Sequence, residues 1–172
     1  MNDAHLHMVI NHFPIIGLIF GTGILLVGIV LKNKSVQNTA FLLLAIAAIF
    51  GFASMATGEG AEEMVEDLPN IGHKIIHEHE ELAEKFVLFL YATGLLGLIS
   101  FYLNLKNNSK VKFVMYATLG VAILTCVFAK SVGTSGGEIR HTEIRETNNQ
   151  LNNAETLRKS TKIITINLIN NG

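Results

Sequence analysis

Four long apolar segments alternate with polar segments along the chain. They are residues 13–31 (FPIIGLIFGTGILLVGIVL), 39–57 (TAFLLLAIAAIFGFASMAT), 86–105 (FVLFLYATGLLGLISFYLNL) and 113–129 (FVMYATLGVAILTCVFA). None contains a charged residue, and each approaches the ~20 residues that a helix needs to cross the hydrocarbon core of a bilayer. Helices of a soluble bundle carry a polar face, which these segments lack. The pattern therefore predicts an all-α integral membrane protein with four spanning helices.

The polar segments predict how these helices are connected. The connections after the first and third apolar segments are short, so each pair of segments should form an antiparallel hairpin, and the two hairpins a four-helix bundle. The third helix should begin well before the bilayer, because Ile75, Ile76, His79, Leu82 and Phe86 keep a helical apolar spacing. After the fourth helix, the glycine-rich stretch 133–137 predicts a turn.

The sequence further divides into two parts. Residues 1–145 are expected to form the membrane bundle, and residues 146–172 a polar, asparagine-rich and flexible tail. Within the acidic segment between the second and third helices, the region around residues 61–68 is expected to be partly helical. The alternation of Ile and Thr at residues 163–169 allows at most one weak strand.

Charge sets the expected orientation. Charged residues make up 16% of the chain, below the roughly 25% usual for soluble domains. Basic residues without acids follow the first apolar segment (Lys32, Lys34) and the third (Lys106, Lys110, Lys112). By the positive-inside rule these two loops are cytoplasmic, so both termini lie on the outer, periplasmic side of a bacterial inner membrane. The partner of such a chain is the lipid bilayer, and nucleic acid is not expected.

The histidines share one predicted face of the membrane. The chain has seven, at positions 5, 7, 12, 73, 77, 79 and 141. Three precede the first apolar segment, three lie between the second and third, and one follows the fourth, so an even number of spans brings them to the same side. Neutral imidazole is the commonest protein ligand for zinc, copper and iron. A metal or haem site at the outer end of the bundle is the resulting hypothesis.

Among these histidines, His79 is the strongest candidate, because it lies on the apolar stripe of the third helix and should face the bundle. A hydrogen-bonded packing residue is an equally good interpretation of that position. His12 stands next to Phe13 and Pro14 at the membrane entry of the first span; the alternative is an interfacial histidine beside a helix capped by Asn11.

Carboxylates complete the expected ligand set. Glu59 follows the second span, and Glu138 precedes His141 by three residues, a spacing that places both side chains on one helical face. A di-iron site would need two such pairs and two more glutamates, so it is disfavoured. The predicted ligands are His12, His79 and His141, assisted by Glu59 and Glu138, with secondary candidates His5, His7, His73, His77 and Glu80. The centre is zinc, copper or iron, or haem b; the rim position favours a small ion or a haem edge near the outer surface.

Three short motifs resemble those of a known family. They are His7-x-x-x-x-His12-Phe13-Pro14, a histidine opening the third span, and Gly136-Gly137-x-x-x-His141. Over residues 5–145 the chain is similar to a family of uncharacterised bacterial four-helix inner-membrane proteins. The resemblance implies such a bundle, with His12, His79 and His141 as the matching histidines. It also implies a respiratory or c-type cytochrome-containing complex as partner, since relatives occur beside or fused to c-type cytochrome domains. The chain lacks Cys-x-x-Cys-His and so does not attach haem c itself.

Two functions therefore compete. The first is binding of a transition metal or haem in respiratory electron transfer or metal handling. The second is a non-catalytic accessory subunit of a larger membrane complex, in which the histidines are merely interfacial. A transporter or proton path is disfavoured, because the spans hold no ionisable residue at mid-membrane depth.

Overall fold

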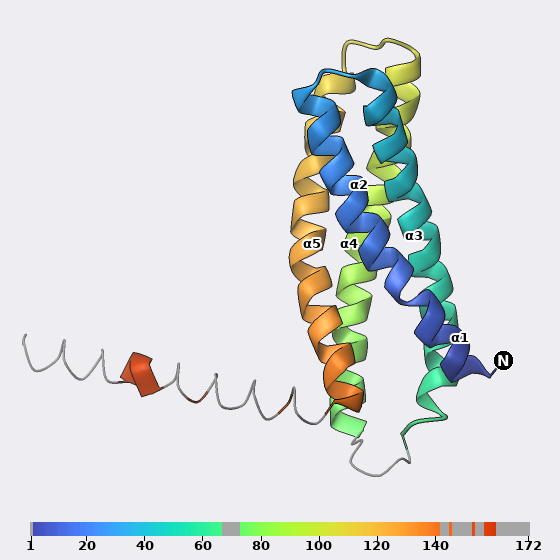
Figure 1. The fold of residues 1–172 in the computed structure, drawn as a ribbon, viewed down its shortest axis with the longest axis vertical. Coiled ribbons are helices and arrows are strands. Elements are labelled where there is room, and N and C mark those ends of the chain that lie inside the picture. Colours follow the sequence, from blue (N-terminus) through green and yellow to red (C-terminus); the bar gives the residue numbers. More distant parts are fainter. Residues whose placement is uncertain (1, 67–72, 142–144, 146–152, 154–156, 161–172) are drawn as a thin grey trace, which may run out of the picture. The chain divides into compact units, whose positions relative to one another are not determined.

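The computed structural model describes residues 2–66, 73–141, 145, 153 and 157–160. Its five principal helices are α1 (Asp3–Ile10), α2 (His12–Val30), α3 (Lys34–Glu62), α4 (His73–Leu105) and α5 (Val111–Arg140) (Figure 1). No strand occurs among the described residues, which confirms the all-α prediction. The weak strand expected at residues 163–169 lies outside them. Residues 1–135 and 136–172 form two compact units, and each is described by itself.

Four helices are long and apolar enough to cross a membrane, as predicted. They cover Asp3–Val30, Lys34–Glu62, His73–Leu105 and Val111–Ile139, and they contain the four apolar segments. With 28 to 33 residues each, they measure about 42–50 Å at 1.5 Å per residue. The hydrocarbon core is only about 30 Å thick. Polar ends of these helices therefore extend beyond the apolar segments.

The first spanning helix is interrupted between α1 and α2. Pro14 has no backbone N–H, so the carbonyl of Ile10 cannot receive the usual bond from four residues later. The helix breaks at Asn11, which occupies the cap position as expected but makes no side-chain cap hydrogen bond. Its Oδ1 is buried without a hydrogen-bond partner in the described part of the chain. Asn2 caps α1 instead, accepting a bond from the His5 amide at 2.9 Å.

Amide side chains join three helices at the end opposite the histidines. The α2–α3 connection turns through Lys32 at a φ of 51°. Beyond it, the buried Gln37 donates from Nε2 to the Gly28 carbonyl at 3.0 Å. Asn104 of α4 in turn donates from Nδ2 to Gln37 Oε1 at 3.4 Å and to Asn38 Oδ1 at 2.7 Å. These bonds satisfy buried polar groups and hold α2, α3 and α4 in register.

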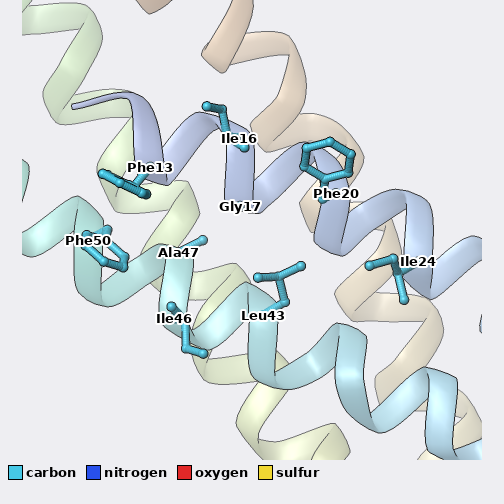
Figure 2. A pocket seen from close by; sticks show the side chains of 9 residues that line it. All are labelled: Phe13, Ile16, Gly17, Phe20, Ile24, Leu43, Ile46, Ala47 and Phe50. Carbon is cyan, nitrogen blue, oxygen red and sulfur yellow. The ribbon is translucent and has the colours of Figure 1, made fainter. Parts of the chain in front are cut away.

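Glycines allow the helices of the first unit to approach closely. A Cβ on Gly17 would lie 2.9 Å from the Ala47 Cβ, and one on Gly94 would lie 2.6 Å from the Ala48 Cβ. The Gly17-x-x-x-Gly21 pattern thus serves packing within the chain, as the sequence favoured. Figure 2 shows Gly17 of α2 facing Ala47 of α3. Both residues line an apolar groove of about 320 Å³. Phe13 and Phe50 also line this groove, and their rings stack with centroids 4.8 Å apart.

Hydroxyl pairs connect α4 to α5. Thr93 and Thr125 lie 3.0 Å apart, and Ser100 and Thr118 also lie 3.0 Å apart, all four fully buried. The pairs are seven residues apart on each helix, so they recur on one face and fix the antiparallel register. Towards the histidine end, the buried side chains that follow on these two helices are apolar. They include Leu90 and Phe86 of α4 and Ala129 and Val132 of α5. These two hydroxyl pairs form a line of buried polar groups, the hydroxyl line, which ends at Thr93 and Thr125.

One local prediction was wrong. The glycine-rich stretch 133–137 is not a turn, because α5 continues through it to Arg140. Glycine costs only about 1 kcal/mol in a helix and proline about 3, and no proline occurs here. Near a membrane the backbone must satisfy its own hydrogen bonds, which favours the helix. Residues 61–68 are helical at their start: α3 itself runs to Glu62, residues 63–66 form a turn, and residues 67 and 68 lie outside the described part.

Candidate functional site

The ring of His7 points from α1 onto the end of α3. Its Nδ1 lies 3.1 Å from the Ser54 carbonyl oxygen and 3.1 Å from Thr57 Oγ1. Gly58 lies beside the ring, where an added Cβ would be in ordinary van der Waals contact with His7 Cε1 at 3.8 Å. A carbonyl oxygen only accepts hydrogen bonds, so Nδ1 of His7 carries the proton and donates. The other ring nitrogen, Nε2, is left with a free electron pair.

His79 of α4 has the same tautomer for a similar reason. Its Nδ1 lies 2.8 Å from Ser135 Oγ on α5. The Ser135 hydroxyl proton is given to the Val132 carbonyl at 3.1 Å. With the hydroxyl proton directed to that carbonyl, Ser135 accepts from His79, an arrangement that puts the proton on Nδ1 and leaves Nε2 unprotonated.

The two rings are electrostatic neighbours. Burial lowers the pKa of His7 below its usual 6.5, an effect partly offset by the bond to the Ser54 carbonyl. Burial also lowers the pKa of His79, and the nearby His7 lowers it further, because two imidazolium charges would repel each other. Both residues lie outside the four apolar segments, and both rings are neutral at pH 7. Two half-buried imidazoles, on α1 and α4, thus interact electrostatically at this end of the bundle, and burial favours the neutral form that ligates metals.

The family of the chain is shown by one comparison. A family model described as "Predicted membrane protein (DUF2231)" matches residues 4–143. The chain belongs to this family. The resemblance inferred from the three motifs is thereby confirmed, as is a multi-pass membrane protein with four apolar helices. No curated protein and no solved structure matches the chain.

The first motif of this DUF2231 chain places its two histidines differently. His12, expected to be a ligand, is exposed, and its Nδ1 lies 3.0 Å from the Met8 carbonyl within its own segment. His7, a secondary candidate, faces the protein. Five residues correspond to about 500° of helical rotation, or roughly 140° between the two side chains. His7 and His12 therefore cannot point the same way. His5 and Glu59 are exposed as well.

The remaining residues of the α3–α4 end form exposed ion pairs. His73 Nδ1 lies 3.6 Å from Glu66 Oε2, and His77 lies 3.8 Å from a Glu80 oxygen and 3.5 Å from a Glu81 oxygen. A hydrogen bond to Glu80, followed by burial and repulsion from that carboxylate, raises the pKa of Glu62. Exposed pairs of this kind contribute little to stability.

Glu138 and His141 belong to the second unit of the DUF2231 chain. The His141 amide donates to the Gly137 carbonyl at 3.0 Å, continuing the helical pattern of α5. Arg145 donates to the carbonyls of Glu138 and, at 2.7 Å, of Ile139. The convergence of His141 with the histidines of the first unit stays a prediction. Among the described residues, no group of three or more His, Cys, Asp or Glu side chains is placed to hold a metal ion.

Sequence reasoning missed the groups that orient the two rings, Ser54, Thr57 and Ser135. A signal for Ser135 was present. Thr118, Thr125, Val132 and Ser135 are spaced by seven, seven and three residues, which puts them on one face of a continuous helix. The predicted turn at residues 133–137 hid this pattern. With α5 unbroken, Ser135 belongs to the face that packs on α4.

Proposed function

We propose that the protein binds a transition-metal centre between α1 and α4, with Nε2 of His7 and Nε2 of His79 as its two protein ligands. The observation that carries the proposal is the shared hydrogen-bonding pattern of two half-buried rings at the same end of the bundle. Each holds its proton on Nδ1 through a hydrogen bond to an oxygen, at 2.8–3.1 Å. Metal-ligating histidines characteristically donate their second N–H in this way, which orients the ring and strengthens the ligand.

The number of ligands favours haem iron. A porphyrin supplies four ligands of its own and takes one or two side chains axially, and histidine is a common choice. The described residues offer this pair and no cluster of three ligands, whereas protein-only zinc sites use three or four. The donor chemistry fits iron, because both rings are neutral with free Nε2 electron pairs. The alternative centre is a zinc, copper or iron ion bound by the same two imidazoles, with water or a partner protein supplying the remaining ligands.

The role that follows is electron transfer or metal handling at one face of the membrane. Haem supplies one-electron chemistry when bound. Here His7 and His79 would hold it, and the hydrogen bonds on their Nδ1 atoms would tune it. The basic loops after α2 and α4 support a periplasmic position for this end of the bundle, by the positive-inside rule. A c-type cytochrome-containing complex would be a suitable electron partner there.

The test is a visible absorption spectrum together with elemental analysis of protein purified from membranes of cells supplied with iron, zinc, copper and a haem precursor. A Soret band with bands that sharpen on reduction identifies haem. A stoichiometric metal without a Soret band identifies an ion. If the folded protein shows neither a Soret band nor a stoichiometric metal, the proposal is overturned and the accessory-subunit function is favoured.

Binding should persist at mildly acidic pH. The pKa values of both histidines lie below 6.5, so protons compete for Nε2 only below that pH. Occupancy is expected to stay constant from pH 8 to about 6.5 and to fall at lower pH. The measurement is the Soret absorbance, or metal per protein, after dialysis at each pH. A loss already between pH 8 and 7 would contradict the assignment of these two ligands.

A further inference from the structure

We propose that Ser135 is the positioning residue of this site: it sets the tautomer of His79 and thereby the strength of His79 as a ligand. The ligand role rests on the proposed function, but the tautomer does not. It is a property of the protein without any bound centre, so it can be tested on its own.

The argument begins with the single proton of the Ser135 hydroxyl. Ser135 Oγ lies 3.1 Å from the Val132 carbonyl of the preceding turn and 2.8 Å from His79 Nδ1. The carbonyl can only accept, and in the arrangement that we propose it receives the hydroxyl proton, which leaves the serine oxygen with electron pairs for one incoming N–H. The serine thus works as a directed acceptor. His79 must supply the proton, and it does so from Nδ1.

The two histidines differ in how strongly this tautomer is enforced. His7 has two acceptors at 3.1 Å, and one of them is the backbone carbonyl of Ser54, which no side-chain substitution removes. His79 relies on a side-chain hydroxyl. Loss of Ser135 would leave a half-buried Nδ1–H without this acceptor. An unmet donor of this kind costs about 1–3 kcal/mol. That cost is enough to let the ring reorient or move its proton to Nε2.

Moving the proton to Nε2 would remove the electron pair that binds metal. Even a rotated ring with the right tautomer would be a weaker ligand, because the bond to Ser135 makes the imidazole more electron-donating. Loss of such an outer hydrogen bond typically lowers metal affinity about 10–100-fold. For an iron centre, a less basic ligand also stabilises the reduced state, so the reduction potential should rise.

The same chain offers matched controls. Thr134 is the neighbouring hydroxyl on α5 and is exposed, so Thr134→Ala removes an equivalent group away from the site. Thr57→Ala removes a hydroxyl from His7 but leaves the Ser54 carbonyl in place. Ser135→Thr keeps the hydroxyl that Ser135→Ala removes, and it should show the wild-type behaviour.

The first measurement uses the full-length protein freed of metal, labelled with ¹⁵N-histidine, in detergent at pH 7.5. Long-range ¹H–¹⁵N NMR should show His79 protonated on Nδ1 in the wild type, in Thr134→Ala and in Ser135→Thr. In Ser135→Ala the Nε2-protonated form should appear, while His7 keeps its tautomer in both Ser135→Ala and Thr57→Ala. An Nε2-protonated His79 in the wild type, or an unchanged spectrum in Ser135→Ala, would overturn the inference.

The second measurement titrates the same proteins with haemin, Cu²⁺ and Zn²⁺. Whichever probe binds the wild type should bind Ser135→Ala about 10–100-fold more weakly and Thr134→Ala equally well. If no probe binds the wild type, the proposed function fails, while the NMR result still decides the role of Ser135. Equal affinity of wild type and Ser135→Ala would refute a role of Ser135 in ligand strength.

Discussion

Replacing either His7 or His79 with alanine is expected to abolish the metal centre. Each variant removes one of the two proposed protein ligands, so occupancy of the proposed centre after purification should fall sharply. Because loss of a mere outer hydrogen bond already costs about 10–100-fold in affinity, loss of a ligand should cost more. The measurement is the Soret absorbance, or the metal content, per mole of protein. Both variants should retain monodisperse elution and helical circular dichroism, since His7 and His79 are only half-buried.

The matched control is His12→Ala. His12 belongs to the same amino-terminal segment and lies closer to the apolar span, but it is exposed and its Nδ1 lies against the Met8 carbonyl. Its replacement should leave occupancy unchanged. The opposite pattern, a centre lost in His12→Ala and kept in His7→Ala, would refute the ligand pair and restore the expectation drawn from the sequence.

Gly94→Ala should strongly destabilise the bundle. The added Cβ would lie 2.6 Å from the Ala48 Cβ and 3.5 Å from the Leu44 carbonyl oxygen. Carbon atoms pack at about 3.5–4.0 Å, and the Ala48 Cβ cannot move without its backbone. Helices α3 and α4 must therefore separate by about 1 Å. Overpacking of this kind costs about 1–3 kcal/mol. The measurement is the free energy of unfolding in mixed micelles.

Gly120→Ala is the control for that variant. A Cβ at position 120 would meet nothing within 4 Å, and the change to alanine favours the helix by up to about 1 kcal/mol. Gly120→Ala should be as stable as the wild type or slightly more stable. Equal destabilisation by the two substitutions would show that α3 and α4 do not pack through Gly94.

The spans could be predicted from sequence because a membrane imposes one simple requirement, a run of apolar residues long enough to cross it. The early start of α4 was also predictable. Its apolar stripe faces the bundle, with Phe86 buried and Leu82 and Ala83 packed on the core. The turn predicted at residues 133–137 was wrong because the low helix propensity of glycine describes isolated or water-exposed chains. Packing and the lack of alternative hydrogen-bond partners near a bilayer outweigh it.

The site was harder to predict than the fold. The choice between His7 and His12 depends on the direction of a short helix before Pro14, and therefore on the break at Asn11. In the sequence, its proximity to the apolar span favoured His12 as the ligand. In the structure, the rotation of the helix directs the side chain of His7, and not that of His12, towards the bundle. The oxygens that orient the rings come from α3 and α5, far away in sequence. Their contacts with His7 and His79 follow only once the register of the helices is known.

The end of the hydroxyl line at Thr93 and Thr125 has a consequence for charge movement. The buried side chains of Leu90, Phe86, Ala129 and Val132 act as an insulating layer between those hydroxyls and His79. Neither protons nor hydrated ions have a chain of polar groups to follow through this layer. A redox centre at His79 would therefore exchange its electrons and compensating protons with a single aqueous compartment. With the proposed centre bound, the bundle would transfer electrons at one surface of the membrane and would not dissipate the transmembrane potential.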